Sequence, residues 1–264
     1  MKDFETVDSA EKVYDLIIKN IPANTLISIF FDVDDTLITP KSKTFKKPPY
    51  NQMIDRIKEN KSNYDNYEEI VSNWRLQRKV ILIDEEWVEV INKLKEKFLV
   101  YALTQMNTGE FGNILSMQDW RYKELKSLDI EFSDNEKLAI YNSGQKDDAI
   151  FYKGIFITGN HSKSGTLSKF SEELNANFIV FVDDRTKHVE DVRDYCKKNK
   201  IGFLGILFDG LKNLTDEPDP KLAEFQESYL IENAQWLEDD EAYYKLQSVC
   251  HPHGSGNPVK NANL

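Results

Sequence analysis

Short apolar runs alternate along the chain with segments in which apolar residues recur every three or four positions. Runs too continuous to have a solvent-facing side predict buried strands at 26–31, 98–103, 177–182 and 201–208. Helical spacing predicts helices near 9–20, 84–94, 116–128, 162–174 and 189–196. Alternation at 151–159 predicts a hairpin. Because buried strands alternate with helices, the expected fold class is α/β with a doubly wound, Rossmann-like parallel sheet.

One segment interrupts this pattern. Between Thr39 and Ile83 the chain becomes polar and charged, with helical spacing only near Ile54 and Trp74. We expect a small helical cap inserted into the core, which resumes at Asp84 as the N-cap of the next helix. The expected organisation is a core with its first part at 1–38, the cap at 39–83, the second part of the core at 84–214, and a C-terminal helical extension with a flexible tail at 215–264. In that extension, we expect the helices at 219–246 to pack back on the core.

Polar side chains follow three of the predicted strands. Asp32 and Asp34 come after the first strand, Thr104 after the second, and Asp183 with Asp184 after the third. The carboxyl ends of parallel strands form the ligand crevice of such a sheet, so these groups should meet there. Buried carboxylates are costly without a positive charge nearby. A hard divalent cation with oxygen ligands, such as Mg²⁺, is the expected counter-charge.

Simpler interpretations exist for the residues of this crevice. Thr104 could cap the turn after its strand, with Thr108 as a substitute in the site, and the two aspartates of the third strand could cap a helix. A calcium-binding loop beginning at Asp32 is rejected, because such a loop needs Gly at its sixth position and Glu at its twelfth. Those positions hold Leu37 and Lys43.

A lysine at the predicted start of a helix adds a cation to the group. Lys163 stands where backbone N–H groups already favour an anion, so its ammonium would complete a phosphate site. A solvated lysine is the alternative, and Lys169 lies further along the helix on a different face. A basic stretch in the insertion is expected to be a solvated loop or a contact for a second anionic group of a substrate; it contains Lys41, Lys43, Lys46 and Lys47.

The order of these groups resembles that of a known superfamily. "DVDDT" (32–36) matches the D-x-D-x-T motif of haloacid-dehalogenase-like (HAD) phosphohydrolases, and Thr104, Lys163 and "VDDR" (182–185) match their later motifs. The resemblance covers about residues 24–210. Within the superfamily the chain looks most like a poorly characterised bacterial group, and "DDRTKHVE" is similar to the phosphatase half of polynucleotide kinases.

The resemblance implies a HAD-like fold and a Mg²⁺-dependent phosphomonoester hydrolase that forms an aspartyl phosphate. Asp32 would be the nucleophile, Asp34 the general acid and base, and Thr104 with Lys163 would hold the phosphoryl oxygens. The metal site would draw on Asp32, Asp34, Asp183 and Asp184, and whether Asp183 or Asp184 is the direct ligand stays open. A catalytically silent HAD-fold scaffold is the alternative from another class. Phosphatases of nucleotides, polynucleotide ends or phosphoproteins are further alternatives.

Composition narrows the expected partners. The net charge of -11 and pI near 5.0 argue against nonspecific nucleic acid binding. No apolar run approaches the roughly 20 residues of a membrane helix, and no signal segment precedes the first helix, so we expect no membrane partner and a cytoplasmic location. Cys196 and Cys250 are expected to be free thiols. "CHPHG" (250–254) could bind a transition metal, although a flexible tail suits its surroundings better.

Overall fold

A mostly parallel sheet organises the molecule. The computed structural model describes residues 4–140 and 145–250. Within them, one seven-stranded sheet has the spatial order β1 (Glu5–Val7), β9 (Gly202–Phe208), β8 (Phe178–Asp183), β2 (Ile27–Phe31), β5 (Leu99–Thr104), β7 (Ile155–Ile157) and β6 (Ile150–Tyr152). Only β6 runs antiparallel to its neighbour, with which it forms the expected hairpin.

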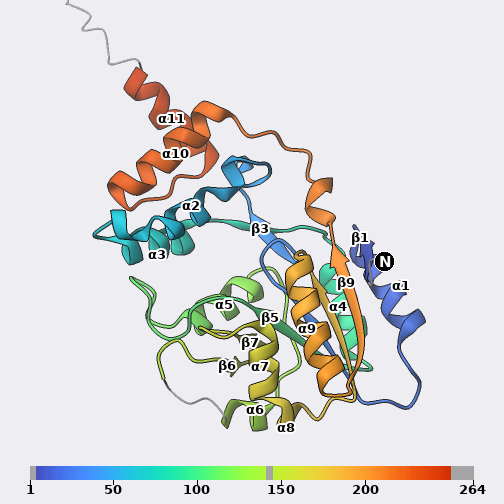
Figure 1. Cartoon of the computed structure of the whole chain (residues 1–264). Helices are drawn as coiled ribbons and strands as arrows, with labels where there is room; N and C mark the ends of the chain where they lie inside the picture. Colours follow the sequence, from blue (N-terminus) through green and yellow to red (C-terminus); the bar gives the residue numbers. More distant parts are fainter. Residues whose placement is uncertain (1–3, 141–144, 251–264) are drawn as a thin grey trace, which may run out of the picture.

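Helices cover both faces of this sheet (Figure 1). Successive residues of a strand point to opposite faces. Ile29 and Phe31 of β2 accordingly join the core cluster on the face of α1 (Ala10–Asn20) and α4 (Trp87–Lys95). Phe30 joins the cluster on the face of α7 (Lys163–Lys169) and α9 (Thr186–Lys198). The remaining core helices are α5 (Met117–Lys126), α6 (Glu136–Ile140) and α8 (Ser171–Leu174). The predicted α/β class and parallel sheet are confirmed.

The order of the strands places a crevice beside β2. The chain leaves β2 for β5 on one side of it and later returns to β8 on the other side. In parallel register, Phe31 of β2 lies opposite Ala102 of β5 and Val182 of β8. The residues that follow these partners therefore emerge side by side. Such a reversal of strand order is where open α/β sheets bind ligands.

The segment after β2 leaves the sheet and returns through a second pair of strands. β3 (Ile38–Pro40) and β4 (Val80–Leu82) form an antiparallel pair that carries α2 (Met53–Glu59) and α3 (Tyr67–Gln77) between them. These helices lie beyond the carboxyl ends of the strands (Figure 1). The insertion thus has helices around Ile54 and Trp74, where the apolar spacing predicted them. The two-stranded base formed by β3 and β4 was not predicted.

The C-terminal helices pack on this insertion, so the prediction that they pack on the core is wrong. α10 (Pro220–Asn233) and α11 (Asp239–Cys250) lie beside α2 and α3 in Figure 1. The ring of Trp236 lies 5.4 Å from that of Phe45, and the Asn73 side chain donates a hydrogen bond of 2.8 Å to the Ala234 carbonyl. Apolar groups that the insertion presents outward thereby become buried.

Two local predictions also need correction. Asp84 is not an N-cap: α4 begins at Trp87, and the Asp84 carboxylate accepts hydrogen bonds from the backbone N–H groups of Glu86 and Ala10, at 2.9 and 2.8 Å. The single helix expected at 162–174 is two helices, because Phe170 leaves helical geometry, with φ -102° and ψ 15°, while its side chain is buried in the core. No helix in the described part of the chain combines the length and apolarity of a membrane span.

Candidate active site

The turn after β2 brings Asp32 to the edge of the sheet. The backbone N–H of Asp32 donates to the Val182 carbonyl at 2.8 Å, which continues the pairing with β8 by one residue. The Thr36 hydroxyl in the same turn accepts a hydrogen bond of 3.1 Å from the Asp184 backbone N–H. The buried indole of Trp87 donates to the Thr36 carbonyl at 3.1 Å. These bonds fix the two acidic segments relative to each other.

Three carboxylates gather at this edge. Oxygens of Asp32, Asp183 and Asp184 all lie within 4.8 Å of one another. Asp32 and Asp183 are buried, and Asp184 is half-buried. This is the group of acidic residues that the sequence predicted for the strand ends, except that the Asp34 side chain lies outside it.

A buried lysine joins two of these carboxylates. The Lys163 ammonium donates to Asp32 at 2.6 Å and to Asp183 at 2.5 Å, and only 1% of its side chain is exposed. Lys163 is the first residue of α7, whose N-cap Ser162 accepts from the Gly165 N–H. The solvated alternative is therefore excluded for Lys163. Lys169 contacts Asp148 and the Ala149 carbonyl instead.

The charges of this group do not balance. Burial opposes charge on Lys163, but Asp32 and Asp183 raise its pKa, so it stays an ammonium. Burial raises the pKa of Asp32 to about 6 despite Lys163. Burial, with Asp32 and Asp183, raises the pKa of Asp184 to about 8.

One ammonium faces three carboxylates, which leaves an excess of two negative charges when all are ionised. A divalent cation with oxygen ligands fits both this excess and the donor set of Asp32, Asp183 and Asp184.

Asp183 has several partners besides Lys163. Its Oδ1 accepts from the Arg185 backbone N–H at 2.8 Å, and His188 Nδ1 lies 3.2 Å from both of its oxygens. Burial acts against ionisation, but Lys163 and His188 lower the pKa of Asp183 below its usual value. With its oxygens engaged in this way, Asp183 orients Lys163 and leaves Asp184 the freer carboxylate of the pair.

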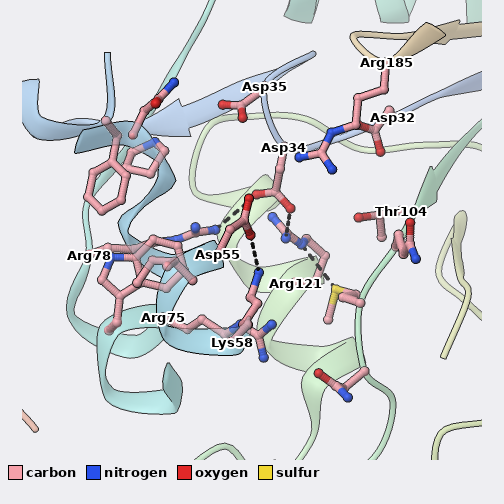
Figure 2. Close-up of a pocket in the computed structure, with 18 of the residues that line it drawn as sticks. Asp32, Asp34, Asp35, Asp55, Lys58, Arg75, Arg78, Thr104, Arg121 and Arg185 are labelled. Atoms are coloured by element: carbon pink, nitrogen blue, oxygen red, sulfur yellow. Dashed lines mark hydrogen bonds and ion pairs between the residues drawn. The ribbon is translucent and has the colours of Figure 1, made fainter. Parts of the chain in front are cut away.

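Asp32 of this group lines a cavity of about 440 Å³ between the sheet edge and the insertion (Figure 2). Thr104, at the end of β5, is buried and lines this cavity close to Asp32. Thr108, the alternative to Thr104, donates to the Asp148 carbonyl at 3.0 Å. The insertion contributes the opposite wall through Phe45, Ile54, Asp55, Lys58, Trp74, Arg75 and Arg78.

Asp34 contacts two arginines that were not predicted to be site residues. Arg121 donates to Asp34 Oδ2 at 2.5 Å, and Arg78 to Oδ1 at 3.3 Å (Figure 2). Both arginines also bind Glu124, and both are nearly fully buried. Burial acts against ionisation of Asp34, but Arg121 and Arg78 outweigh it and hold its pKa well below the usual range.

A sequence signal for Arg121 existed. It stands four residues after Met117 and four before Leu125, both buried, so a charge interrupts an apolar helix face. Arg78 carries no comparable signal, because it lies between α3 and β4 and so on no helix face whose apolar pattern it could interrupt.

The basic stretch of the insertion does not form one solvated loop. Lys46 is buried and donates to the Pro40 carbonyl at 2.5 Å. Lys43 and Lys47 form ion pairs with Asp216 and Glu217. None of these three lines the cavity, whose cations from the insertion are Lys58, Arg75 and Arg78.

Cys196, on α9, is free and buried, and it does not line this cavity. Burial raises the pKa of its thiol to about 12. Cys250 ends α11, and the "CHPHG" segment that it opens, with His251 and His253, lies outside the described residues.

Comparisons with known proteins give a family and one relative. A family model described as a protein of unknown function (DUF2608) matches residues 6–243. An uncharacterized protein of Rickettsia prowazekii (strain Madrid E) is 30% identical over 233 residues, which are 86% of this chain and 84% of that protein. No solved structure matches the chain.

Proposed function

We propose that this chain, which belongs to the DUF2608 family of proteins of unknown function, is a HAD-like Mg²⁺-dependent phosphomonoester hydrolase. One observation carries the proposal. Asp32, Asp183 and Asp184 meet the buried Lys163 at the switch point of a parallel sheet, and Asp32 of this group lines a cavity. It supplies a nucleophile, a cation for phosphoryl oxygens and a place for a metal.

In the first step, a carboxylate oxygen of Asp32 attacks phosphorus. The new bond forms an aspartyl phosphate while the bond to the ester oxygen breaks, and the departing alkoxide takes a proton from water to leave as the alcohol. Lys163 and the Thr104 hydroxyl hold the phosphoryl oxygens through hydrogen bonds. Mg²⁺, held by Asp32, Asp184 and the Asp34 carbonyl, would neutralise negative charge on the phosphoryl group.

In the second step, water attacks the phosphorus of the aspartyl phosphate and restores the Asp32 carboxylate with release of phosphate. Asp34 accepts the proton of that water. Arg78 and Arg121 keep Asp34 in the ionised form that a base needs at the start of this step, although the same contacts weaken it as a base. As the acid for the departing alcohol, Asp34 must first take up a proton, which both arginines oppose. We therefore assign Asp34 chiefly to the second step.

The rival function is a HAD-like binding or scaffold protein without turnover. The purified protein should release phosphate from phenyl phosphate when Mg²⁺ is present and stop when EDTA is added. Release should resume when excess Mg²⁺ is restored. A panel of phosphorylated metabolites, nucleotides, polynucleotide ends and phosphopeptides then separates the remaining phosphatase alternatives. A folded protein that binds Mg²⁺ and releases no phosphate from any of these compounds favours the scaffold.

Metal binding should depend on pH through Asp184. Because its pKa is raised to about 8 without metal, binding below that pH must displace a proton from its carboxyl group. The apparent Mg²⁺ affinity should therefore rise about tenfold from pH 6 to 7 and about fivefold from pH 7 to 8, and level off above pH 8. Calorimetric titration in buffers of different ionisation enthalpy measures both the affinity and the released proton. Asp184→Asn should bind Mg²⁺ weakly with little pH dependence, and a wild-type affinity that stays constant over this range contradicts the assignment.

A further inference from the structure

Arg75 is a cation of the cavity that forms no ion pair within the described residues. Its side chain lines the cavity from α3, and it forms no ion pair with any carboxylate in the described part of the chain. Its guanidinium lies over the ring of Phe111 at 4.9 Å and near that of Trp120 at 5.9 Å, and one nitrogen lies 3.7 Å from the Met117 sulfur. Such stacking occupies the flat face of a guanidinium and leaves N–H groups at its edge for a ligand.

The surroundings make this charge costly. Burial, with repulsion from Arg78 and Arg121, lowers the pKa of Arg75 to about 10. Those two arginines are neutralised by Asp34 and Glu124, to which they bind directly. A partly buried charge without a bound counter-ion is unfavourable unless an anion reaches it when the protein works.

Lys58 adds a second cation beside Arg75. It lines the cavity from α2, and its one described carboxylate partner is Asp55, at 3.3 Å. Burial lowers the pKa of Lys58, and repulsion from the nearby Arg75 lowers it further. Figure 2 shows both side chains at the end of the cavity opposite Asp32 and Thr104, with Asp34 between the two ends. Both ends line the same cavity.

We propose that the substrate is a phosphomonoester with a second anionic group, a phosphate or carboxylate, and that Arg75 and Lys58 bind this second group. The inference rests on the proposed function, because it assigns the reacting phosphate to the end with Asp32. Arg75 offers paired N–H donors that match the oxygens of either anion, and Lys58 offers a point charge. The insertion thus selects substrates by their charge at the end remote from the chemistry.

A matched series of compounds tests this selection. Alkanediyl bisphosphates of three to six carbons are compared with the hydroxyalkyl phosphates of the same length, so that each pair differs in one anionic group. A carboxyalkyl phosphate of each length distinguishes the two candidate anions. The quantity measured is the ratio of kcat/KM within each pair, with saturating Mg²⁺.

For the wild type, the member with two anionic groups should be preferred by about 10- to 100-fold in at least one pair, which is the contribution of charge-assisted hydrogen bonds. Arg75→Met should remove most of this preference, Lys58→Met should reduce it, and Arg75→Lys should restore part of it. Arg56→Met is the matched control, because Arg56 is on α2 with Lys58 but pairs with Glu227 outside the cavity. It should keep the wild-type ratio.

Failure of this inference can be told from failure of the proposed function. Hydrolysis of the compounds with one and with two anionic groups at ratios near one overturns the second anion site and leaves the phosphatase standing. If no compound is hydrolysed, the proposed phosphatase function is contradicted. Calorimetric titration with alkanediyl bisphosphonates and hydroxyalkyl phosphonates then still tests whether Arg75 and Lys58 form a second anion site. Tighter binding of a bisphosphonate that Arg75→Met abolishes supports the site, and equal binding of both classes overturns it.

Discussion

Asp32→Asn should reduce phosphate release to below about one thousandth of the wild-type kcat. The amide cannot form the bond to phosphorus that the proposed first step requires. It can still accept a hydrogen bond from Lys163, which donates to Asp32 at 2.6 Å, so the fold should persist. Phosphate release with Mg²⁺ measures the loss, and circular dichroism with thermal unfolding measures the integrity of the fold.

Asp35→Asn is the matched control for this change. Asp35 also lines the cavity, and it adopts the left-handed conformation with φ 61°, which Asn tolerates. The Asp35→Asn variant also loses one carboxylate near the metal site, and it should lose far less activity than Asp32→Asn. If both variants lose the same fraction of kcat, the effect comes from charge around the site, and Asp32 is not the nucleophile.

Lys163→Met should be the most destabilising single change in the site. It leaves the buried carboxylates of Asp32 and Asp183 facing each other with no cation between them. Breaking a buried ion pair on one side costs about 3–5 kcal/mol of the free energy of unfolding. Denaturant unfolding of the wild type and the variant without Mg²⁺ measures this difference.

The destabilisation caused by Lys163→Met should depend on pH. Lys163 holds the pKa of Asp183 below its usual value, and that stabilisation is present above the ordinary pKa of Asp and is lost as the pH falls below it. Without Lys163, both carboxylates can be neutralised by protons, so the destabilisation should be larger at pH 8 than at pH 5.

Lys169→Met is the comparison for this variant, because Lys169 is on the same helix and is 23% exposed in its pair with Asp148. It should cost much less at either pH. An equal cost for the two variants contradicts the central role of Lys163 in the charge balance.

The central sheet could be predicted because its strands are short, continuous apolar runs. "LISIFF" and "NFIVFV" leave no solvent-facing side, so their burial between two layers of helices follows from the sequence. The same rule places the residues after those strands at one edge. Asp32 and Asp183 could thus be brought together across about 150 intervening residues, as their register in the sheet now shows.

The opposite wall of the cavity could not be predicted in the same way. Lys58 and Arg75 come from short helices of the insertion, and their positions depend on how that insertion folds over the sheet edge. Polar spacing within a helix predicts a solvated face and does not show what lies opposite. The strands β1, β3 and β4 were not predicted for a related reason. Each has three residues, and an alternation with a period of two cannot be recognised over so few positions.

The packing of the C-terminal helices on the insertion has a consequence for how relatives could diverge. Phe45 and Trp74 line the cavity, and Trp236 packs on Phe45 from behind. The Thr44 hydroxyl donates to Gln226 of α10, 182 positions away in the chain. A substitution in α10 or α11 that shifts this support would reshape the cavity wall while touching no ligand. Selection on ligand preference can therefore act on the last quarter of the chain, far from every residue that performs the chemistry.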